Sequence, residues 1–94
     1  MKSQTPWVYI LECADGSFYT GWTYHIPSRL AAHNAGKGAK YTRSRRPLRL
    51  IYQEQMENKS AALKREWALK QLSHKQKLAL VQETLSKQPF LSKI

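Results

Sequence analysis

The sequence predicts an α+β domain in which a strand hairpin leads into a short helix, a third strand and two further helices. Residues 7–21 are rich in β-branched and aromatic side chains and contain an Asp15-Gly16 turn signal, as in a hairpin. A second run of alternating apolar residues covers residues 48–56, and apolar residues recur at helical spacing over residues 58–85.

The predicted hairpin can adopt two registers, and the choice decides where its tyrosines point. A two-residue turn at Asp15-Gly16 would place Tyr9 and Tyr19 on opposite faces of the sheet. A three-residue loop over residues 14–16, with Gly16 in the left-handed conformation, would shift the pairing by one residue and place both tyrosines on one face. Local sequence alone slightly favours the shorter turn, because Asp-Gly is its strongest signal.

Length and composition are those of one small folded domain. With 94 residues, of which 41% are hydrophobic, the chain can bury one modest core, which we expect over residues 5–82, followed by a frayed tail at 83–94. Cys13 is the single cysteine, so no disulfide can form within the chain. No apolar run approaches the roughly 20 residues that span a membrane, and the N-terminal residues do not resemble a signal peptide, so we expect a cytoplasmic protein without a membrane partner.

Positive charge is the strongest compositional feature. The chain has 16 Lys and Arg residues against 6 Asp and Glu residues, a net charge of +10. Residues 37–49 contribute +6 of this charge, because they contain six basic residues and no acidic one. Such an excess favours nucleic acid as the partner, through phosphate contacts and counterion release. The alternative is a basic protein whose charge serves only solubility.

A short helix is predicted over residues 27–35, because Pro27 suits a first helical turn and Gly36 suits a C-terminal cap. Arg29 and His33 are four residues apart and share one side of this helix. Nothing in the local sequence distinguishes Arg29 from an ordinary exposed arginine.

Residues 36–47 form a polar loop with two glycines, a proline and a cluster of basic side chains. A single helical turn fits residues 40–43. The composition predicts a loop that contacts phosphates, with a tyrosine that stacks on a base or sugar; a solvated linker is the alternative. The candidate nucleic-acid-binding residues are Lys37, Lys40, Tyr41, Arg43, Arg45 and Arg46.

A third strand is predicted over residues 48–56. Leu48, Leu50 and Tyr52 alternate with the residues between them, which is the period of a strand. Strict alternation would place these three side chains on one face of the sheet.

Two helices complete the predicted fold. Asn58 or Ser60 can cap a helix that runs to about residue 72, and Ser73 can cap a last helix over residues 74–85.

Glu66 has an unusual position in the first of these two helices. At about 100° per residue, it falls within an arc of apolar residues that is broken by Lys70. The arc is bounded by Leu63, Trp67 and Leu69. A buried carboxylate is costly unless it is paired or binds a metal ion. An exposed i,i+4 ion pair with Lys70, worth about 0.3–0.5 kcal/mol, explains the spacing slightly better on local grounds.

Several of these residues together resemble the signature of the GIY-YIG nuclease superfamily. The tripeptides Val8-Tyr9-Ile10 and Tyr19-Thr20-Gly21 are similar to its two motifs. Arg29 matches the arginine of the superfamily, and Glu66 matches its metal-binding glutamate. Residues 33–47 look like the small, single-domain bacterial branch, and the resemblance covers nearly the whole chain.

The resemblance implies a small three-stranded antiparallel sheet covered by helices, with both tyrosines facing the active site, so it favours the three-residue turn. It also implies metal-dependent hydrolysis of phosphodiester bonds in nucleic acid, for repair or processing. We expect DNA rather than RNA as the substrate, and a monomeric protein. Tyr9, Tyr19 and Arg29 match the catalytic residues, and His33 is a supporting contact. Glu66 matches the ligand of one Mg²⁺ or Mn²⁺ ion, a role that suits a hard carboxylate.

The sequence is also compatible with two other functions. The first is a basic nucleic-acid-binding module that keeps the fold without turnover, and the second is a protein-interaction domain. The complete Tyr-Tyr-Arg-Glu set favours the nuclease, because a carboxylate at a phosphate site repels the substrate unless a cation lies between them.

Overall fold

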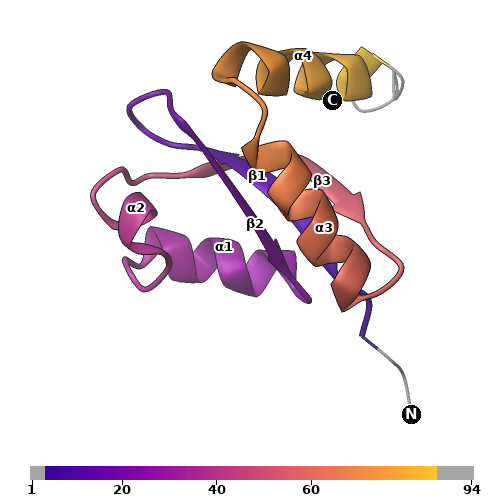
Figure 1. Cartoon of the computed structure of the whole chain (residues 1–94). Helices are drawn as coiled ribbons and strands as arrows, with labels where there is room; N and C mark the ends of the chain where they lie inside the picture. Colours follow the sequence, from indigo (N-terminus) through magenta and orange to yellow (C-terminus); the bar gives the residue numbers. More distant parts are fainter. Residues whose placement is uncertain (1–3, 87–94) are drawn as a thin grey trace.

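The computed structural model describes residues 4–86 and shows a three-stranded antiparallel sheet with helices on both faces (Figure 1). The first elements are β1 (Trp7–Glu12), β2 (Phe18–Thr23), α1 (Ile26–Asn34) and α2 (Lys40–Arg43). The remaining elements are β3 (Arg49–Gln55), α3 (Lys59–Lys70) and α4 (His74–Ser86). The strand order is β2-β1-β3, so β1 lies in the middle of the sheet. The predicted α+β class and element order are confirmed, and α2 forms the single helical turn in the basic loop.

The β1–β2 hairpin has the longer of the two loops that its sequence allows. Tyr9 pairs with Gly21, which corresponds to a three-residue loop over residues 14–16. Gly16 has a φ of 86°, a left-handed conformation that glycine adopts without steric cost. Tyr9 and Tyr19 therefore share one face of the sheet, as the resemblance implied, and the shorter turn that local sequence favoured is wrong.

A β-bulge in β3 changes which of its side chains share a face. Ile10 pairs with Tyr52 whereas Leu11 pairs with Leu50, so Ile51 is an extra residue on β3. Leu50 consequently packs on the α1 side of the sheet, and Tyr52 packs on the α3 side. The strict alternation predicted from the sequence is therefore wrong at Tyr52, because a pattern of apolar residues does not reveal a bulge.

Two small apolar cores lie on opposite faces of the sheet. The buried side chains beneath α3 and α4 are Val8, Ile10, Tyr52, Ala62, Leu69 and Val81. The buried side chains on the face covered by α1 are Tyr9, Leu11, Cys13, Ile26 and Leu48. Side chains alternate along a strand, so the central strand β1 supplies both cores.

The helix caps are those that the sequence offers. The side chain of Asn58 accepts a hydrogen bond from the backbone N–H of Ala61 at 2.8 Å, so Asn58 caps α3. The hydroxyl oxygen of Ser73 accepts a hydrogen bond from the backbone N–H of Gln76 at 3.1 Å at the start of α4.

The element bounds differ from the predicted ones by one or two residues for α1, β3 and the end of α3. α4 runs to Ser86, past residue 82, where we expected the domain to end. The rest of the expected tail, residues 87–94, lies outside the described residues. Within residues 4–86, no helix combines the length and the apolar character that crossing a membrane requires.

Gly21 lies against the Tyr9 ring, and this contact leads to a first prediction. A Cβ atom at Gly21 would lie 2.6 Å from the Tyr9 hydroxyl oxygen. Gly21→Ala must therefore displace the phenol, and we expect a loss of about 1–3 kcal/mol in the free energy of unfolding, measured by urea denaturation. The NMR signals of the Tyr9 ring should shift in the same variant.

Gly16→Ala is the control, because a Cβ atom there meets nothing within 4 Å and the cost is backbone strain alone. It should leave the Tyr9 signals unchanged. A Gly21→Ala protein with wild-type stability and wild-type Tyr9 signals would contradict the prediction.

Candidate functional site

Two tyrosines from neighbouring strands form the centre of the candidate site. Tyr9 on β1 and Tyr19 on β2 lie on the sheet face that α1 covers, and their ring centroids are 6.5 Å apart. Tyr9 is 2% exposed, whereas Tyr19 is half-buried. The three-residue hairpin loop is what places both phenols on this face.

A chain of hydrogen bonds holds Tyr9 from the protein interior. The Tyr9 hydroxyl oxygen lies 3.0 Å from Nε2 of His33, and Nδ1 of His33 lies 2.8 Å from the hydroxyl oxygen of Thr42. The Thr42 hydroxyl donates to the carbonyl of Ala39 at 2.9 Å, so it must accept its other bond from Nδ1–H of His33. Nε2 of the neutral imidazole is then an acceptor, and the Tyr9 hydroxyl donates to it.

Burial keeps the titratable members of this chain neutral. His33 and Thr42 are each 0% exposed. Burial lowers the pKa of His33 below its ordinary value of 6.5, and the charge of Arg29 lowers it further. Burial raises the pKa of Tyr9 above its ordinary value of 10.0, although interaction with Arg29 acts in the opposite direction. Tyr9 is therefore a protonated donor near neutral pH and cannot serve as a general base there.

Tyr19 has a different environment. Its ring meets the His33 ring edge-on, with 5.2 Å between the centroids. Within the part of the chain that the structure describes, its hydroxyl forms no hydrogen bond. Of the two tyrosines, Tyr19 is thus the one whose hydroxyl is available to a water molecule or a substrate.

Arg29 and Glu66 both act on Tyr9, although they come from helices on opposite faces of the sheet. Burial has the largest effect on the pKa of Tyr9. Of the charged and polar neighbours, Arg29 lowers this pKa, whereas Tyr19 and Glu66 raise it. Tyr19, Arg29 and Glu66 therefore all lie close enough to Tyr9 to influence its charge.

The Glu66 carboxylate combines the two environments that the sequence left open. It lies 3.3 Å from the ammonium of Lys70, so the i,i+4 ion pair forms. Its side chain is nevertheless only 18% exposed, so this is no ordinary surface pair. The preceding residue, Arg65, donates to Glu54 of β3 at 2.8 Å and fixes the rotation of α3. Glu66 is turned by about 100° from Arg65 along the helix, and its charge acts on Tyr9.

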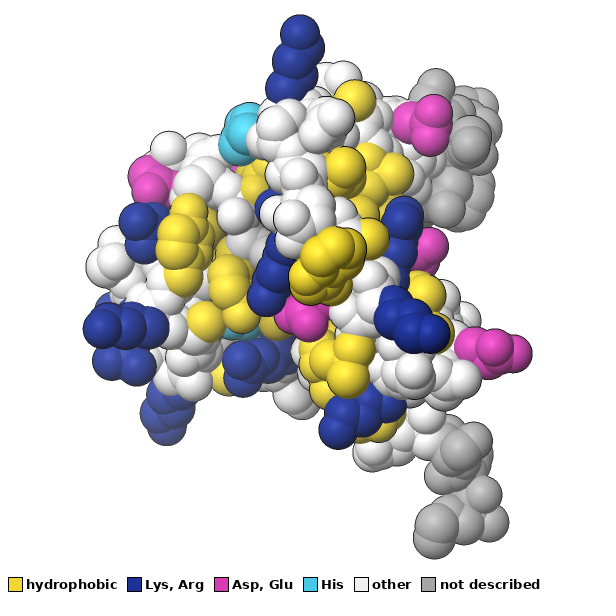
Figure 2. Space-filling model, viewed as in Figure 1, with side chains coloured by type: hydrophobic (Ala, Val, Ile, Leu, Met, Phe, Trp, Pro, Cys, Tyr) yellow, Lys and Arg dark blue, Asp and Glu magenta, His cyan; other side chains and the backbone are white. Residues whose placement is uncertain are grey.

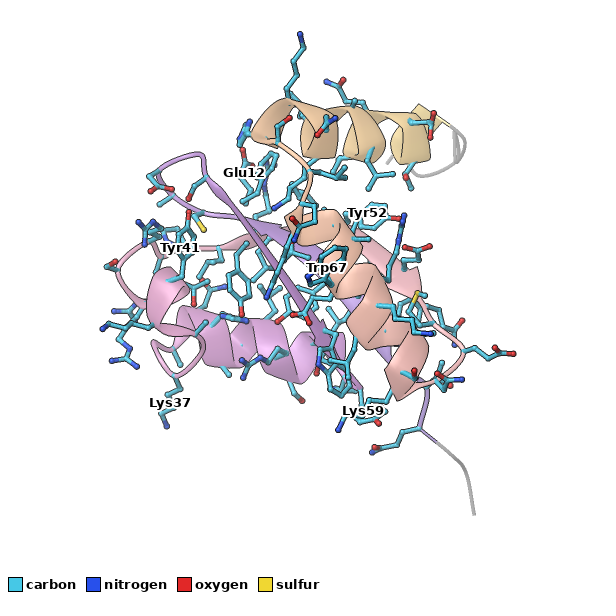
Figure 3. All side chains as sticks on the ribbon, viewed as in Figure 1. Glu12, Lys37, Tyr41, Tyr52, Lys59 and Trp67 are labelled. Atoms are coloured by element: carbon cyan, nitrogen blue, oxygen red, sulfur yellow. The ribbon has the colours of Figure 1, made fainter. Side chains whose placement is uncertain are left out.

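The apolar residues around Glu66 on α3 are buried on one side of it and exposed on the other. Leu69 is 1% exposed, but Leu63 is 44% exposed and Trp67 is 67% exposed. Trp67 lies on the outer side of α3, over the near face of the molecule (Figure 3). Glu66 therefore lies at the boundary between the core and solvent, where a ligand can reach it.

The predicted nucleic-acid-binding residues divide into two groups. Lys37, Lys40 and Arg43 are exposed, and their side chains have no ion-pair or hydrogen-bond partner within residues 4–86. Figure 2 shows Lys and Arg side chains gathered over α1 and α2 at the lower left of this face, and Lys37 points away from the protein in Figure 3. These three cations are free to contact phosphates.

Arg45 and Arg46 instead bind within the protein. Arg45 donates to the carboxylate of Asp15 at 3.1 Å and to the carbonyl of Tyr41 at 2.7 Å. Arg46 donates to the carbonyl of Arg43 at 2.9 Å. The Arg45 guanidinium also lies 3.9 Å from the centre of the Tyr41 ring, so one face of the predicted stacking tyrosine is already covered.

The donor set near the tyrosines determines which metal ion the site could bind. Within residues 4–86, no group of three or more His, Cys, Asp or Glu side chains could hold an ion by itself. Both ring nitrogens of His33 are used in hydrogen bonds, which leaves Glu66 as the ligand. One carboxylate, with water and substrate phosphate as further ligands, fits a hard divalent cation such as Mg²⁺ or Mn²⁺.

A small sheet with paired tyrosines on adjacent strands, an arginine on the next helix and a glutamate on a later one defines a class of nucleases. Residues 5–79 match the family model described as the GIY-YIG catalytic domain. The chain therefore belongs to the GIY-YIG family of nucleases, whose members typically use divalent metal ions.

Curated relatives carry a name that states no activity. The UPF0213 protein SH2523 of Staphylococcus haemolyticus is 52% identical over 77 residues, which are 82% of this chain and 94% of the relative. The UPF0213 protein SSP2268 of Staphylococcus saprophyticus is 51% identical with the same coverage.

Two solved structures resemble this one. The solution NMR structure of the protein EF2693 from E. faecalis has a TM-score of 0.61 at 44% identity and covers 88% of both chains. That of the UPF0213 protein BH0048 from Bacillus halodurans has a TM-score of 0.54 at 46% identity and covers 83% of both chains.

The contrast between the two tyrosines leads to a second prediction. Tyr9→Phe leaves Nε2 of the buried His33 without its donor, so we expect it to lose about 1–3 kcal/mol in the free energy of unfolding. Tyr19→Phe removes a hydroxyl without an internal partner and should change that free energy by less than about 0.5 kcal/mol. Urea denaturation of both variants tests this, and equal losses would show that Tyr19 also has a structural hydrogen bond.

Proposed function

We propose that the protein is a metal-dependent endonuclease that hydrolyses phosphodiester bonds in nucleic acid, with DNA rather than RNA as the expected substrate. The observation that carries the proposal is a largely buried carboxylate, Glu66, beside Arg29 and two tyrosines in a chain of net charge +10. A carboxylate weakens the binding of a phosphate unless a cation lies between them. Binding alone therefore gives no reason for Glu66 to lie here.

Arg29 and Tyr19 would act directly on the substrate. The guanidinium of Arg29 offers paired donors to the phosphate oxygens, where negative charge grows in the transition state. Tyr19, whose hydroxyl has no hydrogen-bond partner within the described residues, would orient the attacking water.

Tyr9 and His33 would position the site. Their hydrogen bond holds the phenol of Tyr9 in place, and neither group carries a charge near neutral pH. A rigid neutral donor orients water or phosphate without adding to the charge of the site.

Glu66 would hold one Mg²⁺ or Mn²⁺ ion. When bound, such an ion neutralises charge on the phosphate and on the leaving oxygen. Lys70 neutralises the carboxylate in the structure as it stands, at 3.3 Å.

The same ion pair favours a second candidate function. Because Lys70 offsets the charge of Glu66 without a cation, a binding module that has lost turnover would also tolerate the carboxylate. The two functions differ in what removal of the carboxylate does to cleavage.

Our third prediction separates them. Glu66→Gln should abolish divalent-dependent cleavage of branched, flapped, nicked and single-stranded DNA and RNA, while affinity stays equal or rises. The variant removes the proposed metal ligand and the negative charge, but keeps the volume of the side chain. Cleavage is followed on labelled substrates with Mg²⁺ and with Mn²⁺, and affinity is measured without metal.

Glu57→Gln is the matched control. This substitution removes the same charge, but Glu57 is exposed and lies in the β3–α3 connection, away from the candidate site. Its cleavage rate should equal that of the wild type. Persistent cleavage by purified Glu66→Gln protein would contradict the metal role, and a wild type that binds without cleaving any substrate would favour the binding module.

Our fourth prediction concerns the basic loop. Replacing Lys40 and Arg43 together by glutamine should reduce the slope of log affinity against log salt by about 0.7–0.9 per lost phosphate contact, without loss of stability. Replacing Arg45 and Arg46 should lower the free energy of unfolding as well, because both are bonded within the protein. An unchanged salt slope in the Lys40 and Arg43 variant would show that these two residues do not contact the nucleic acid.

A further inference from the structure

A small basic cavity adjoins the candidate site at the outer edge of β2. It has a volume of about 300 Å³, and its lining residues are Phe18, Tyr19, Thr20, Tyr41, Lys70 and Lys77. β2 is an edge strand of the sheet, so the cavity opens beside it. Tyr19 and Lys70 belong to both places, because Tyr19 is central to the candidate site and Lys70 pairs with Glu66.

Two lysines give this cavity its charge. Lys77 is half-buried on α4, and its side chain has no ion-pair or hydrogen-bond partner among residues 4–86. Burial lowers the pKa of Lys77, and the positive charge of Lys70 lowers it further. A partly buried ammonium beside a second cation is unfavourable, and an anion in the cavity would offset that cost.

Thr20 forms part of the wall that β2 contributes to the cavity. Thr20 is 2% exposed, and its hydroxyl oxygen is a buried polar atom without a hydrogen-bond partner in the described part of the chain. Proteins pair nearly all of their buried polar groups with protein or water. This oxygen is closed off from the cavity in the structure, so the charge of the two lysines is what favours an anionic ligand there.

We propose that this cavity binds a backbone phosphate of the nucleic-acid strand, next to the phosphate that is cleaved. The proposal rests on the proposed nuclease function, since the strand reaches the cavity by crossing Tyr19, which lines both places. Lys70 and Lys77 are point charges suited to a phosphate. Phe18 and Tyr41 also line the cavity, but each ring already stacks within the protein, Phe18 on His74 and Tyr41 on Tyr19.

The cavity also gives the strand a path across the molecule. Lys40 and Arg43 belong to α2, which lies on one side of β2 in Figure 1, and Lys70 and Lys77 belong to α3 and α4 on the other side. A strand that crosses the tyrosines therefore meets positive charge before and after the site of cleavage.

The first experiment compares Lys77→Gln with Lys75→Gln, which removes the same charge from an exposed position of the same helix. Affinity for a labelled single-stranded oligonucleotide of about 12 nucleotides is measured by fluorescence anisotropy in EDTA over a range of salt. Lys77→Gln should weaken binding about tenfold and reduce the salt slope by about 0.7. Lys75→Gln should weaken it less than about twofold, and Lys77→Arg should restore affinity.

The second experiment tests for a contact between Lys77 and one phosphate. Each phosphate of the oligonucleotide is replaced in turn by an uncharged methylphosphonate. At one position the replacement should weaken binding to the wild type but not to Lys77→Gln, because the two changes remove the same contact. The position should be a neighbour of the cleaved bond when the same oligonucleotide is cut with Mg²⁺.

The outcomes separate this proposal from the proposed function. Equal effects of Lys77→Gln and Lys75→Gln, or additive effects at every phosphate, would overturn the cavity while leaving the nuclease intact. Competition by inorganic phosphate that depends on Lys77, without coupling to any oligonucleotide phosphate, would show a small-anion site and would also overturn it. Coupling at one phosphate in a protein that cuts no substrate would support the cavity and remove the nuclease function.

Discussion

The hydrogen bond between Tyr9 and His33 is the interaction on which the site depends. It joins the central strand β1 to α1, and through Thr42 it reaches α2 and the basic loop. All three side chains are buried, so none of these polar groups can exchange its partner for bulk water without opening the structure. The backbone of the basic loop can pack directly on the His33 ring because residue 38 is a glycine. A Cβ atom at Gly38 would lie 2.2 Å from Nδ1 of His33. The face that carries the candidate site and the basic loop are thus held in one arrangement.

The ion pair of one carboxylate differs from the ion pairs of the others. Within the described residues, Glu12, Asp15 and Glu54 pair with Arg49, Arg45 and Arg65, and these pairs connect separate elements. Glu66 pairs with a lysine of its own helix and is the least exposed of the four carboxylates. Because this ion pair lies within one helix, the carboxylate can exchange Lys70 for another partner without breaking a contact between elements. A carboxylate that binds a metal ion needs this freedom.

The sequence predicted the element order and the caps at Asn58 and Ser73, because these features depend on local pattern. It also pointed to the residues of the candidate site, through the matched motifs. The hairpin register was not decided by local sequence, since Asp15-Gly16 suits both turns. The bulge at Ile51 had no signal, because it depends on how β3 pairs with β1. Thr42 was missed for a similar reason: a threonine between basic residues gives no sign that it is buried against His33.

The helical arc around Glu66 shows what a periodic pattern cannot determine. Spacing identifies which residues share a side of α3, but the area of sheet beneath the helix decides how much of that side is covered. A three-stranded sheet is narrow, so α3 buries only Ala62 and Leu69 and leaves Leu63 and Trp67 in solvent. Glu66 consequently lies at the border of the core, where partial desolvation strengthens its interactions and a ligand can still enter. A wider sheet would have covered the carboxylate and removed the site.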